Sequence, residues 1–368
     1  MERKTFTAVL LSLGVLLLAI LGLISVLLLW GPAQEVIANL REKAFFGLGR
    51  SPKAQLVVQV QIQDAVKAEA DRTIDLLSEA LGQAGIACSA IERNDPASIL
   101  EAGQIQIEIR GVSPNQAEAL RNVVADRFGV WVLARDAAPP FRLTLRPSEL
   151  TILRQQAVGQ TVETLQKRLR ALGVMARVLP RPGLGDAPDI VVQVAARTDD
   201  PGRLKQILGA HGLLEIAVVK DGPFPNRESA LAKYGGALPP NTKLIRTAAR
   251  RPDPASWYLL NRRPAITGRD LRNARPAQDQ NGRWETDFTL AAEGADRFAR
   301  FTESNIGEQA AIVLDNQVLS APTIQTRIEG RGRITGASSQ QEAADLALVL
   351  RSGALPAGIV FLEERTLP

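Results

Sequence analysis

The sequence has 368 residues, of which 45% are hydrophobic and 23% charged. This length allows roughly two to three domains, each able to bury a core. The 44 Lys and Arg residues exceed the 39 Asp and Glu residues by too little to indicate nucleic-acid binding by net charge alone. Cys88 and His211 are the only residues of their types, which excludes an intrachain disulfide, a thiolate metal cluster and any metal site built on two imidazoles.

The first element in chain order is an uncharged run over residues 6–30, dominated by Leu, Val, Ile and Ala. At about 1.5 Å per residue it reaches roughly 37 Å, against roughly 30 Å of hydrocarbon in a bilayer. Arg3 and Lys4 precede it, which by the positive-inside rule predicts a cytoplasmic N-terminus and an extracytoplasmic remainder. The alternative is a cleaved signal peptide. We favour an uncleaved anchor because the run exceeds the usual apolar region of about 7–15 residues and ends at Trp30.

Residues 55–219 predict the same order of elements twice: strand, helix, strand, strand, helix, strand. The first copy, residues 55–136, opens on an alternating strand at 56–62 and a helix whose apolar stripe runs to Ala84. Its remaining strands are predicted at 86–91, 105–109 and 130–133, with a second helix that starts at Ser113-Pro114.

The second copy, residues 140–219, has helices that start at Ser148 and Asp200 and strands predicted at 141–145, 174–179, 190–194 and 213–219. We therefore expect two ferredoxin-like βαββαβ units, each with helices on one face of its sheet. This architecture hosts many functions and selects none by itself.

Residues 220–269 are interrupted by seven prolines, which predicts a loop-rich segment with short strands at best. The overlapping stretch 246–275 carries eight arginines, opposed by Asp253 and Asp270. Outside the cytoplasm such a stretch has no nucleic acid to bind, so its functional interpretation is contact with anionic lipid head groups or with an acidic partner segment. We favour the plainer alternative of a solvated, arginine-rich surface.

Residues 270–368 predict a third unit of mixed helix and strand. Asn281-Gly282 and Asp315-Asn316 each indicate a hairpin turn between two strands. Ser339 and Glu342 form a capping-box pattern that starts a helix. The other predicted elements of this unit are a helix at 291–305 and strands at 284–290, 310–314, 318–319 and 359–362.

Several blocks of the distal third occur in a familiar order and spacing: NIG at 305–307, AIVLD at 311–315, VLSAP at 318–322, EAADLA at 342–347, LRSGALP at 350–356 and EERT at 363–366. Together they resemble the head of the first large extracytoplasmic domain of SecD, the preprotein translocase subunit family. Upstream, residues 156–173 and 190–208 are similar to the paired α/β base that carries this head in the family.

The resemblance implies a membrane-anchored accessory to Sec-dependent export in the bacterial inner membrane. It would bind a translocating preprotein on the outer side and hinder its backsliding, while base and head change their relative orientation. The implied partners are the preprotein, membrane subunits of the Sec translocon, a multi-span SecD- or SecF-type protein and membrane lipids. No nucleic acid and no cofactor is expected.

The expected organisation is an α+β protein with these parts: a cytoplasmic N-terminus and transmembrane anchor (1–31), a linker (32–54), two ferredoxin-like units (55–136 and 140–219), the loop-rich segment (220–269) and the head subdomain (270–368).

Two features depart from the family pattern. The chain stops at Pro368, where SecD proteins continue into further membrane helices, and the run 6–30 holds no ionisable group for a proton path. Gly49 stands where the family's Gly-Leu-Asp-Leu block has its aspartate. A stand-alone protein that uses another chain's pump, a degenerate copy and a fragment of a longer chain are all compatible with this pattern.

The candidate preprotein-binding or hinge residues lie in two clusters: Leu319, Ala321, Pro322 and Ile324 after a hairpin, and Gly353, Leu355 and Pro356 after the last helix. An unfolded segment needs exposed apolar side chains or free strand edges to bind to. The alternative is that these residues pack the head or shape its hinge, with Gly353 as the glycine after a helix end.

No nucleophile in the sequence has a credible partner base, so we expect no enzyme. The runner-up function is a single-span scaffold or interaction module of the cell envelope, derived from a SecD-type domain. A third class, an envelope hydrolase, would need activity that is lost in a His211→Ala variant or on substitution of a carboxylate.

Overall fold

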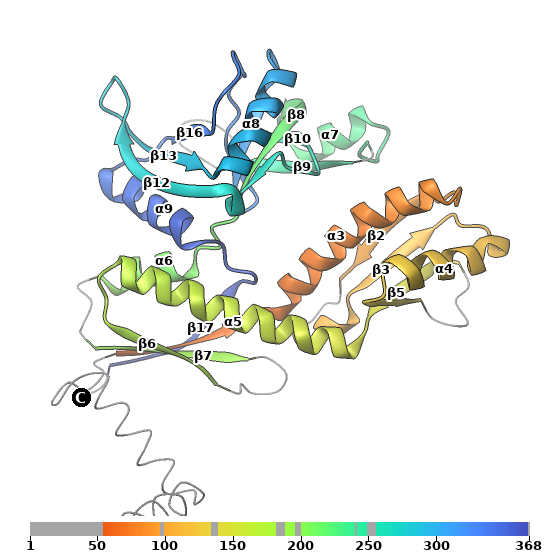
Figure 1. The fold of residues 1–368 in the computed structure, drawn as a ribbon, viewed down its shortest axis with the longest axis horizontal. Coiled ribbons are helices and arrows are strands. Elements are labelled where there is room, and N and C mark those ends of the chain that lie inside the picture. Colours follow the sequence, from red (N-terminus) through yellow and green to blue (C-terminus); the bar gives the residue numbers. More distant parts are fainter. Residues whose placement is uncertain are drawn as a thin grey trace, which may run out of the picture.

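The computed structural model describes residues 54–95, 99–133, 139–181, 188–195, 200–239, 241–248 and 255–366. The predicted membrane anchor at 6–30 lies outside these ranges. Within them, no helix combines the length and the apolar composition that a bilayer span requires. Over these ranges the structure is mixed α+β, with four sheets arranged as a base that carries a head (Figure 1).

The base contains two four-stranded antiparallel sheets. In the first, the strand order is β2 (Ala90–Asn94), β3 (Gln106–Arg110), β5 (Phe141–Leu145), β4 (Trp131–Leu133). In the second, it is β17 (Ile359–Thr366), β1 (Ala54–Val60), β7 (Asp189–Val194), β6 (Ala176–Arg181). The helices of the base are α3 (Ile62–Gln83), α4 (Ala117–Arg127), α5 (Pro147–Ala171) and α6 (Pro201–Gly209), with short 3-10 turns at Ile99–Gln104 and Pro114–Gln116.

The two predicted repeats exchange their first strands. The sequence predicted β1 in the sheet of β2–β4, and β5 in the sheet of β6 and β7, whereas each lies in the other sheet. The exchange is explained by the length of the helices that follow these strands, since α3 has 22 residues and α5 has 25. At about 1.5 Å per residue they extend over roughly 33 and 37 Å, and each carries the chain from one sheet to the other. Figure 1 shows α3 and α5 crossing the base in opposite directions.

A second correction concerns the last strand of the second repeat. Strand β8 (Leu214–Phe224) is paired within the head, and the C-terminal strand β17 takes the place predicted for it beside β1. Leu214 and Ile216 of β8 are buried in the main core of the head. Alternation identifies β8 as a half-buried strand, but it does not specify which sheet buries it.

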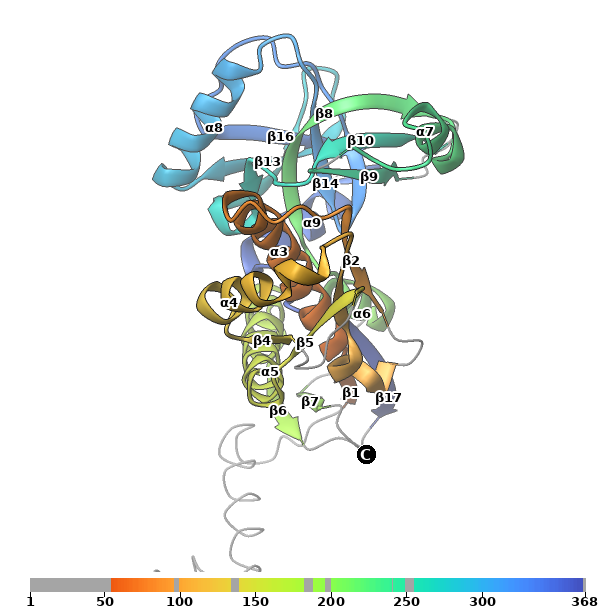
Figure 2. The same ribbon diagram turned by 90° about the vertical axis from the view of Figure 1, so that its right-hand side faces the viewer.

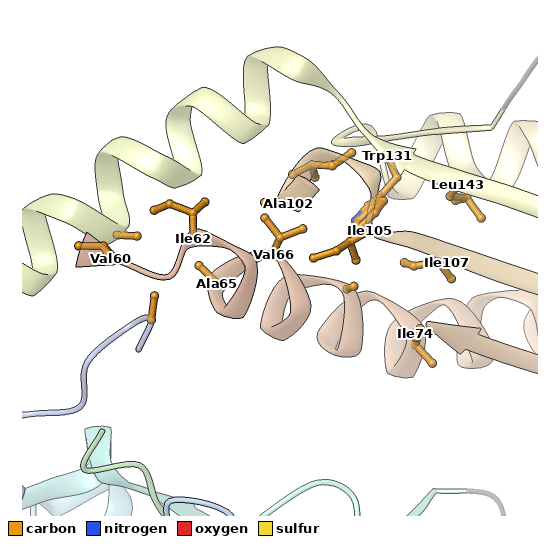
Figure 3. Packing of buried hydrophobic residues seen from close by; sticks show 14 of the residues in the cluster. Val60, Ile62, Ala65, Val66, Ile74, Ala102, Ile105, Ile107, Trp131 and Leu143 are labelled. Atoms are coloured by element: carbon orange, nitrogen blue, oxygen red, sulfur yellow. The ribbon is translucent and has the colours of Figure 1, made fainter. Parts of the chain in front are cut away.

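One continuous hydrophobic core fills the base. It joins side chains of both sheets, among them Val58 and Val192 of the second and Ile107 and Leu143 of the first. Figure 3 shows α3 lying along this core, from Val60 and Ile62 at one end to Ile74 at the other. At the centre, the buried indole Nε1 of Trp131 donates a hydrogen bond to Thr73 Oγ1 over 2.9 Å.

The head is built on a six-stranded sheet of order β10, β9, β15, β14, β8, β11 and a three-stranded sheet of order β12, β13, β16. Its strands besides β8 are β9 (Thr242–Thr247), β10 (Trp257–Asn261), β11 (Ile266–Thr267), β12 (Leu271–Gln278), β13 (Trp284–Leu290), β14 (Ala310–Leu314), β15 (Gln317–Ser320) and β16 (Arg331–Thr335). Its helices are α7 (Arg227–Lys233), α8 (Ala292–Ser304) and α9 (Gln340–Ser352), with a 3-10 turn at Gly268–Asp270. Both views show α9 between the head sheets and the base (Figures 1 and 2).

The segment 220–269 is more ordered than its prolines predicted, since it supplies α7, β9, β10 and β11 to the head. Pro239 and Pro264 precede β9 and β11, so they separate elements and do not interrupt them. The predicted hairpins are confirmed: Asn281-Gly282 joins β12 to β13, and Asp315 and Asn316 adopt φ of 50° and 61° between β14 and β15. Strand β16 was not predicted, because Arg331–Thr335 holds a single large apolar residue, Ile334.

Candidate functional site at the base–head junction

Within the described residues, the chain passes between base and head twice, from α6 into β8 and from α9 into β17 (Figure 1). The two connections lie side by side, because Leu355 N donates a hydrogen bond to His211 O over 2.8 Å. Gly212 has φ +72°, and a Cβ on it would lie 2.7 Å from Val349 Cγ1 of α9. Gly353, which caps α9, has φ +89°. Each connection therefore contains a glycine whose conformation other residues rarely adopt.

A small apolar cluster joins base to head at this point. Ile207 of α6 is buried against Leu348 and Val349 of α9, with Leu172 and Ala210 partly buried beside them. The ends of α5 and α6 thus pack directly on the last helix of the head.

The guanidinium of Arg168, on α5, lies at the centre of the junction and is fully buried. Its Nη1 donates hydrogen bonds to the carbonyl oxygens of Ile207, Leu208 and Ala210 at the end of α6. Its Nε donates to Ser352 Oγ over 3.3 Å, and its Nη2 donates to Gly353 O over 3.1 Å and to His211 O over 3.5 Å. Burial lowers the pKa of Arg168 to about 10, against a smaller opposing effect of Asp315, so the side chain stays charged at neutral pH.

Two sets of ion pairs connect the base to the head. Arg203 of α6 forms a bidentate pair with Asp345 of α9, with Nε–Oδ2 and Nη2–Oδ1 distances of 3.0 and 2.7 Å. The Asp345 carboxylate, as hydrogen-bond partner, raises the pKa of Arg203. On the side of α3, Arg263 of the head lies 3.2 Å from Glu79, and the Arg262 Nε lies 3.7 Å from Asp75.

A cavity of about 450 Å³ opens between α6 and the head beside this junction. Its apolar lining includes Ile207 from the base and Leu319, Leu346 and Val349 from the head. Two of the carboxylates that line it accept hydrogen bonds from backbone N–H groups at helix starts: Asp200, the N-cap of α6, accepts from Arg203 N over 2.8 Å, and Glu342, in the first turn of α9, accepts from Ser338 N over 2.7 Å. Apolar walls with a polar rim suit the binding of a polypeptide side chain.

Within the described ranges, no group of three or more His, Cys, Asp or Glu side chains is placed to hold a metal ion. Cys88, the single cysteine of the sequence, is partly buried in the base, and burial raises the pKa of its thiol.

The first cluster of candidate residues is divided by the structure. Leu319 lines the cavity at the junction. Ala321 packs against the cluster on the far face of the six-stranded sheet. Pro322 is exposed, while Ile324 is 4% exposed and belongs to the core of the head.

The second cluster lies in the connection from head to base. Gly353 accepts a hydrogen bond from Arg168, and Leu355 is buried and bonded to the other connection. Pro356 is partly exposed. These three positions therefore shape the connection, and Leu355 offers little surface to a partner.

Sequence reasoning missed the charged residues of the junction: Arg168, Arg203, Asp315 and Asp345. One signal was available for Arg168, which follows Leu165 by three residues and so lies on the inward stripe of its helix. Asp315 was read as a turn residue, but its Oδ1 also accepts a hydrogen bond from Leu213 N over 2.8 Å at the start of β8. Arg203 and Asp345 are separated by 142 residues, and no local pattern relates them.

Comparison with known proteins gives a consistent result. Residues 243–357 match the family model described as "SecDF, P1 head subdomain". The chain is 35% identical over 328 residues to the protein translocase subunit SecD of Koribacter versatilis, covering 89% of this chain and 60% of the relative. It is 38% identical over 217 residues to SecD of Aquifex aeolicus, covering 58% of this chain and 40% of the relative. The chain thus spans about 60% of the length of the first of these curated relatives.

Among solved structures, the chain is 32% identical to one described as "Structure and function of a membrane component SecDF that enhances protein export", with 58% of this chain and 94% of that chain covered and a TM-score of 0.44. It is also 32% identical to a "Crystal structure of SecDF in Super-membrane-facing form", covering 57% of this chain and 28% of that chain, again with a TM-score of 0.44.

Proposed function

The chain belongs to the SecD family, and from that premise we propose that it acts in protein translocation by binding a polypeptide in transit on the outer side of the bacterial inner membrane. The observation that carries the proposal is the cavity at the base–head junction, whose apolar walls include Leu319. An unfolded segment can place a side chain between apolar residues without a fixed sequence. Bound in this way, the segment is hindered from sliding back.

The two connections between base and head support a change in their relative orientation. Each contains a glycine with positive φ, Gly212 or Gly353, and the apolar contact between the two parts is limited to a small cluster. The cavity is lined by both parts, so such a change alters its width. We propose that a multi-span protein of the SecF type is a partner in this change.

The remaining parts of the proposal concern topology and partners. We propose that residues 6–30 anchor the chain as a single span with its N-terminus in the cytoplasm. We also propose that the base consists of two ferredoxin-like units whose first strands are exchanged. Membrane subunits of the Sec translocon and membrane lipids are the partners expected near the anchor.

Site-specific photo-crosslinking tests the binding of a polypeptide. A photoreactive residue at Leu319 in the full, membrane-inserted chain is expected to form adducts with a stalled secretory precursor. The matched control is Val132, an apolar residue of β4 that is 40% exposed on the base. Adducts at both positions to the same extent, or adducts with folded mature proteins alone, would contradict the proposal.

A second candidate function, an envelope scaffold or interaction module, is favoured by one observation. Leu179, Val360 and Leu362, in the edge strands of the second base sheet, are 36%, 45% and 47% exposed. Exposed apolar residues in one sheet suit docking to a partner domain. Affinity capture of the full chain that recovers envelope-assembly proteins and no translocon subunit would support this candidate over the first.

A further inference from the structure

We infer that Arg168 is a positioning residue whose single guanidinium holds the head in a defined orientation on the base. The observation behind this is the distribution of its hydrogen bonds, which reach both chain connections at once. The inference concerns the resting geometry of the protein and does not depend on the proposed function.

The guanidinium divides into two halves. Nη1 bonds only to the end of α6, through the carbonyl oxygens of Ile207, Leu208 and Ala210. Nε and Nη2 bond to the connection that leaves α9, through Ser352 Oγ and Gly353 O, and Nη2 also reaches His211 O. Nη1 thus bonds only to the base, whereas Nε and Nη2 supply every bond of this side chain to the end of α9, with one further bond of Nη2 to His211 in the connection that follows α6.

The chemistry of the acceptors explains why an arginine occupies this position. The last carbonyl groups of a helix have no partner within the helix, and the helix dipole makes that end favourable for a cation. Here the ends of α6 and α9 converge on one buried charge, and within the described residues its hydrogen bonds are accepted by neutral oxygens. Only the planar fork of arginine supplies enough donors, in fixed directions, for two helix ends.

The packing around the Arg168 guanidinium leaves little room for another orientation of this side chain. A Cβ on Gly212 would lie 3.4 Å from Arg168 Nη2 and 3.7 Å from Gly353 O. Ser352 Oγ also donates to Val349 O over 2.9 Å, so this hydroxyl is aligned to accept from Arg168 Nε. A head that rotates away from the base must therefore break the bonds to Ser352 Oγ and Gly353 O, while those of Nη1 to the end of α6 can persist.

The division into halves makes Arg168→Lys the informative variant. Lysine keeps the charge on a compact ammonium, which can cap α6 but cannot also reach Ser352 and Gly353. Arg168→Met removes both halves and leaves carbonyl groups without partners, so this variant is expected to weaken folding as well. Arg170→Lys, at an exposed arginine on the same helix, is the matched control.

The measurement is a distance distribution between spin labels on the full chain in lipid nanodiscs, without substrate. In a Cys88→Ser background, spin labels are placed at Gln160 of α5 and Asp296 of α8, which are both exposed. The distance between these labels reports the orientation of the head relative to the base. A second pair at Gln160 and Asp126, an exposed residue of α4, reports the base alone. We expect Arg168→Lys to broaden or shift the first distribution and leave the second unchanged, whereas Arg170→Lys changes neither.

Two results would overturn the inference. Unchanged distributions for both pairs in Arg168→Lys would show that the head is held without this residue. Equal broadening of both pairs would show that Arg168 only stabilises the base. Ser352→Ala, which removes the acceptor of Nε alone, provides an independent check: its effect on the first pair is expected to be smaller than that of Arg168→Lys and of the same kind. Neither distance depends on whether the protein binds a preprotein, so failure here is distinguishable from failure of the proposed function.

Discussion

The base and the head bury their apolar residues in different ways. In the base, the two sheets share one core, because β1 and β5 are exchanged and α3 and α5 pass from sheet to sheet. In the head, the buried residues divide into a main cluster between the sheets, a second on the other side of the six-stranded sheet and a third under α7. We therefore expect the two base sheets to unfold together, and the clusters of the head to be separable.

Few contacts join the base to the head at the junction. A small apolar cluster, one buried arginine and partly exposed ion pairs form the contact. An interface of this kind holds an orientation without merging the two cores, which allows each unit to be perturbed separately.

The largest expected effect comes from Trp131→Ala in the base. The indole is 1% exposed and bonded to Thr73, so its removal leaves a large cavity and an unpaired hydroxyl, at a cost of about 4–5 kcal/mol. Because the core is continuous, we expect hydrogen exchange to accelerate in β1 and β7 of the second sheet as well as in β4. Acceleration confined to the sheet of β4 would show that the two base sheets unfold independently.

A smaller and more local effect is expected from Phe288→Ala in the head. Phe288 is 2% exposed, but one side of its ring faces the backbone of Gly332, where a Cβ would lie 2.3 Å from the ring. We expect a loss of about 3 kcal/mol, measured by chemical denaturation. Exchange should accelerate in β12, β13 and β16, while the base and the far face of the six-stranded sheet keep their protection. Loss of protection throughout the head would contradict the division into separate clusters.

The smallest effect is expected from the Arg203–Asp345 pair. Its side chains are 37% and 23% exposed, so solvent screens the charges and the coupling should be about 0.5–1 kcal/mol. A double-mutant cycle with Arg203→Ala and Asp345→Ala, read as unfolding free energy at low and high salt, measures this coupling. We expect it to fall at high salt. A coupling that is independent of salt would indicate that the pair is shielded from solvent and contributes more to the junction.

Much of the secondary structure could be predicted because its signals are local. Strand β5 begins and ends where its alternation predicted, and Asp200 caps α6 through Arg203 N as its position before Pro201 indicated. The two hairpin turns were recognisable from Asn281-Gly282 and Asp315-Asn316. The candidate site was predictable only in part: Leu319 lines the cavity, whereas Ile324 and Leu355 are buried.

The sequence by itself determined many of the helices and strands, the cap of α6 at Asp200, the two hairpin turns and which family the chain resembles, because periodicity, capping and motif spacing depend on residues close together in the chain. Only the tertiary structure decided that β1 and β5 exchange sheets, that β17 takes the place predicted for β8, and that Arg168 bonds to residues up to 185 positions away. These strand-pairing and hydrogen-bond partners lie far apart in the sequence, so they depend on how the whole chain packs. An alternating strand fits any sheet with a matching apolar face, and a buried cation fits wherever enough unpaired carbonyl groups converge.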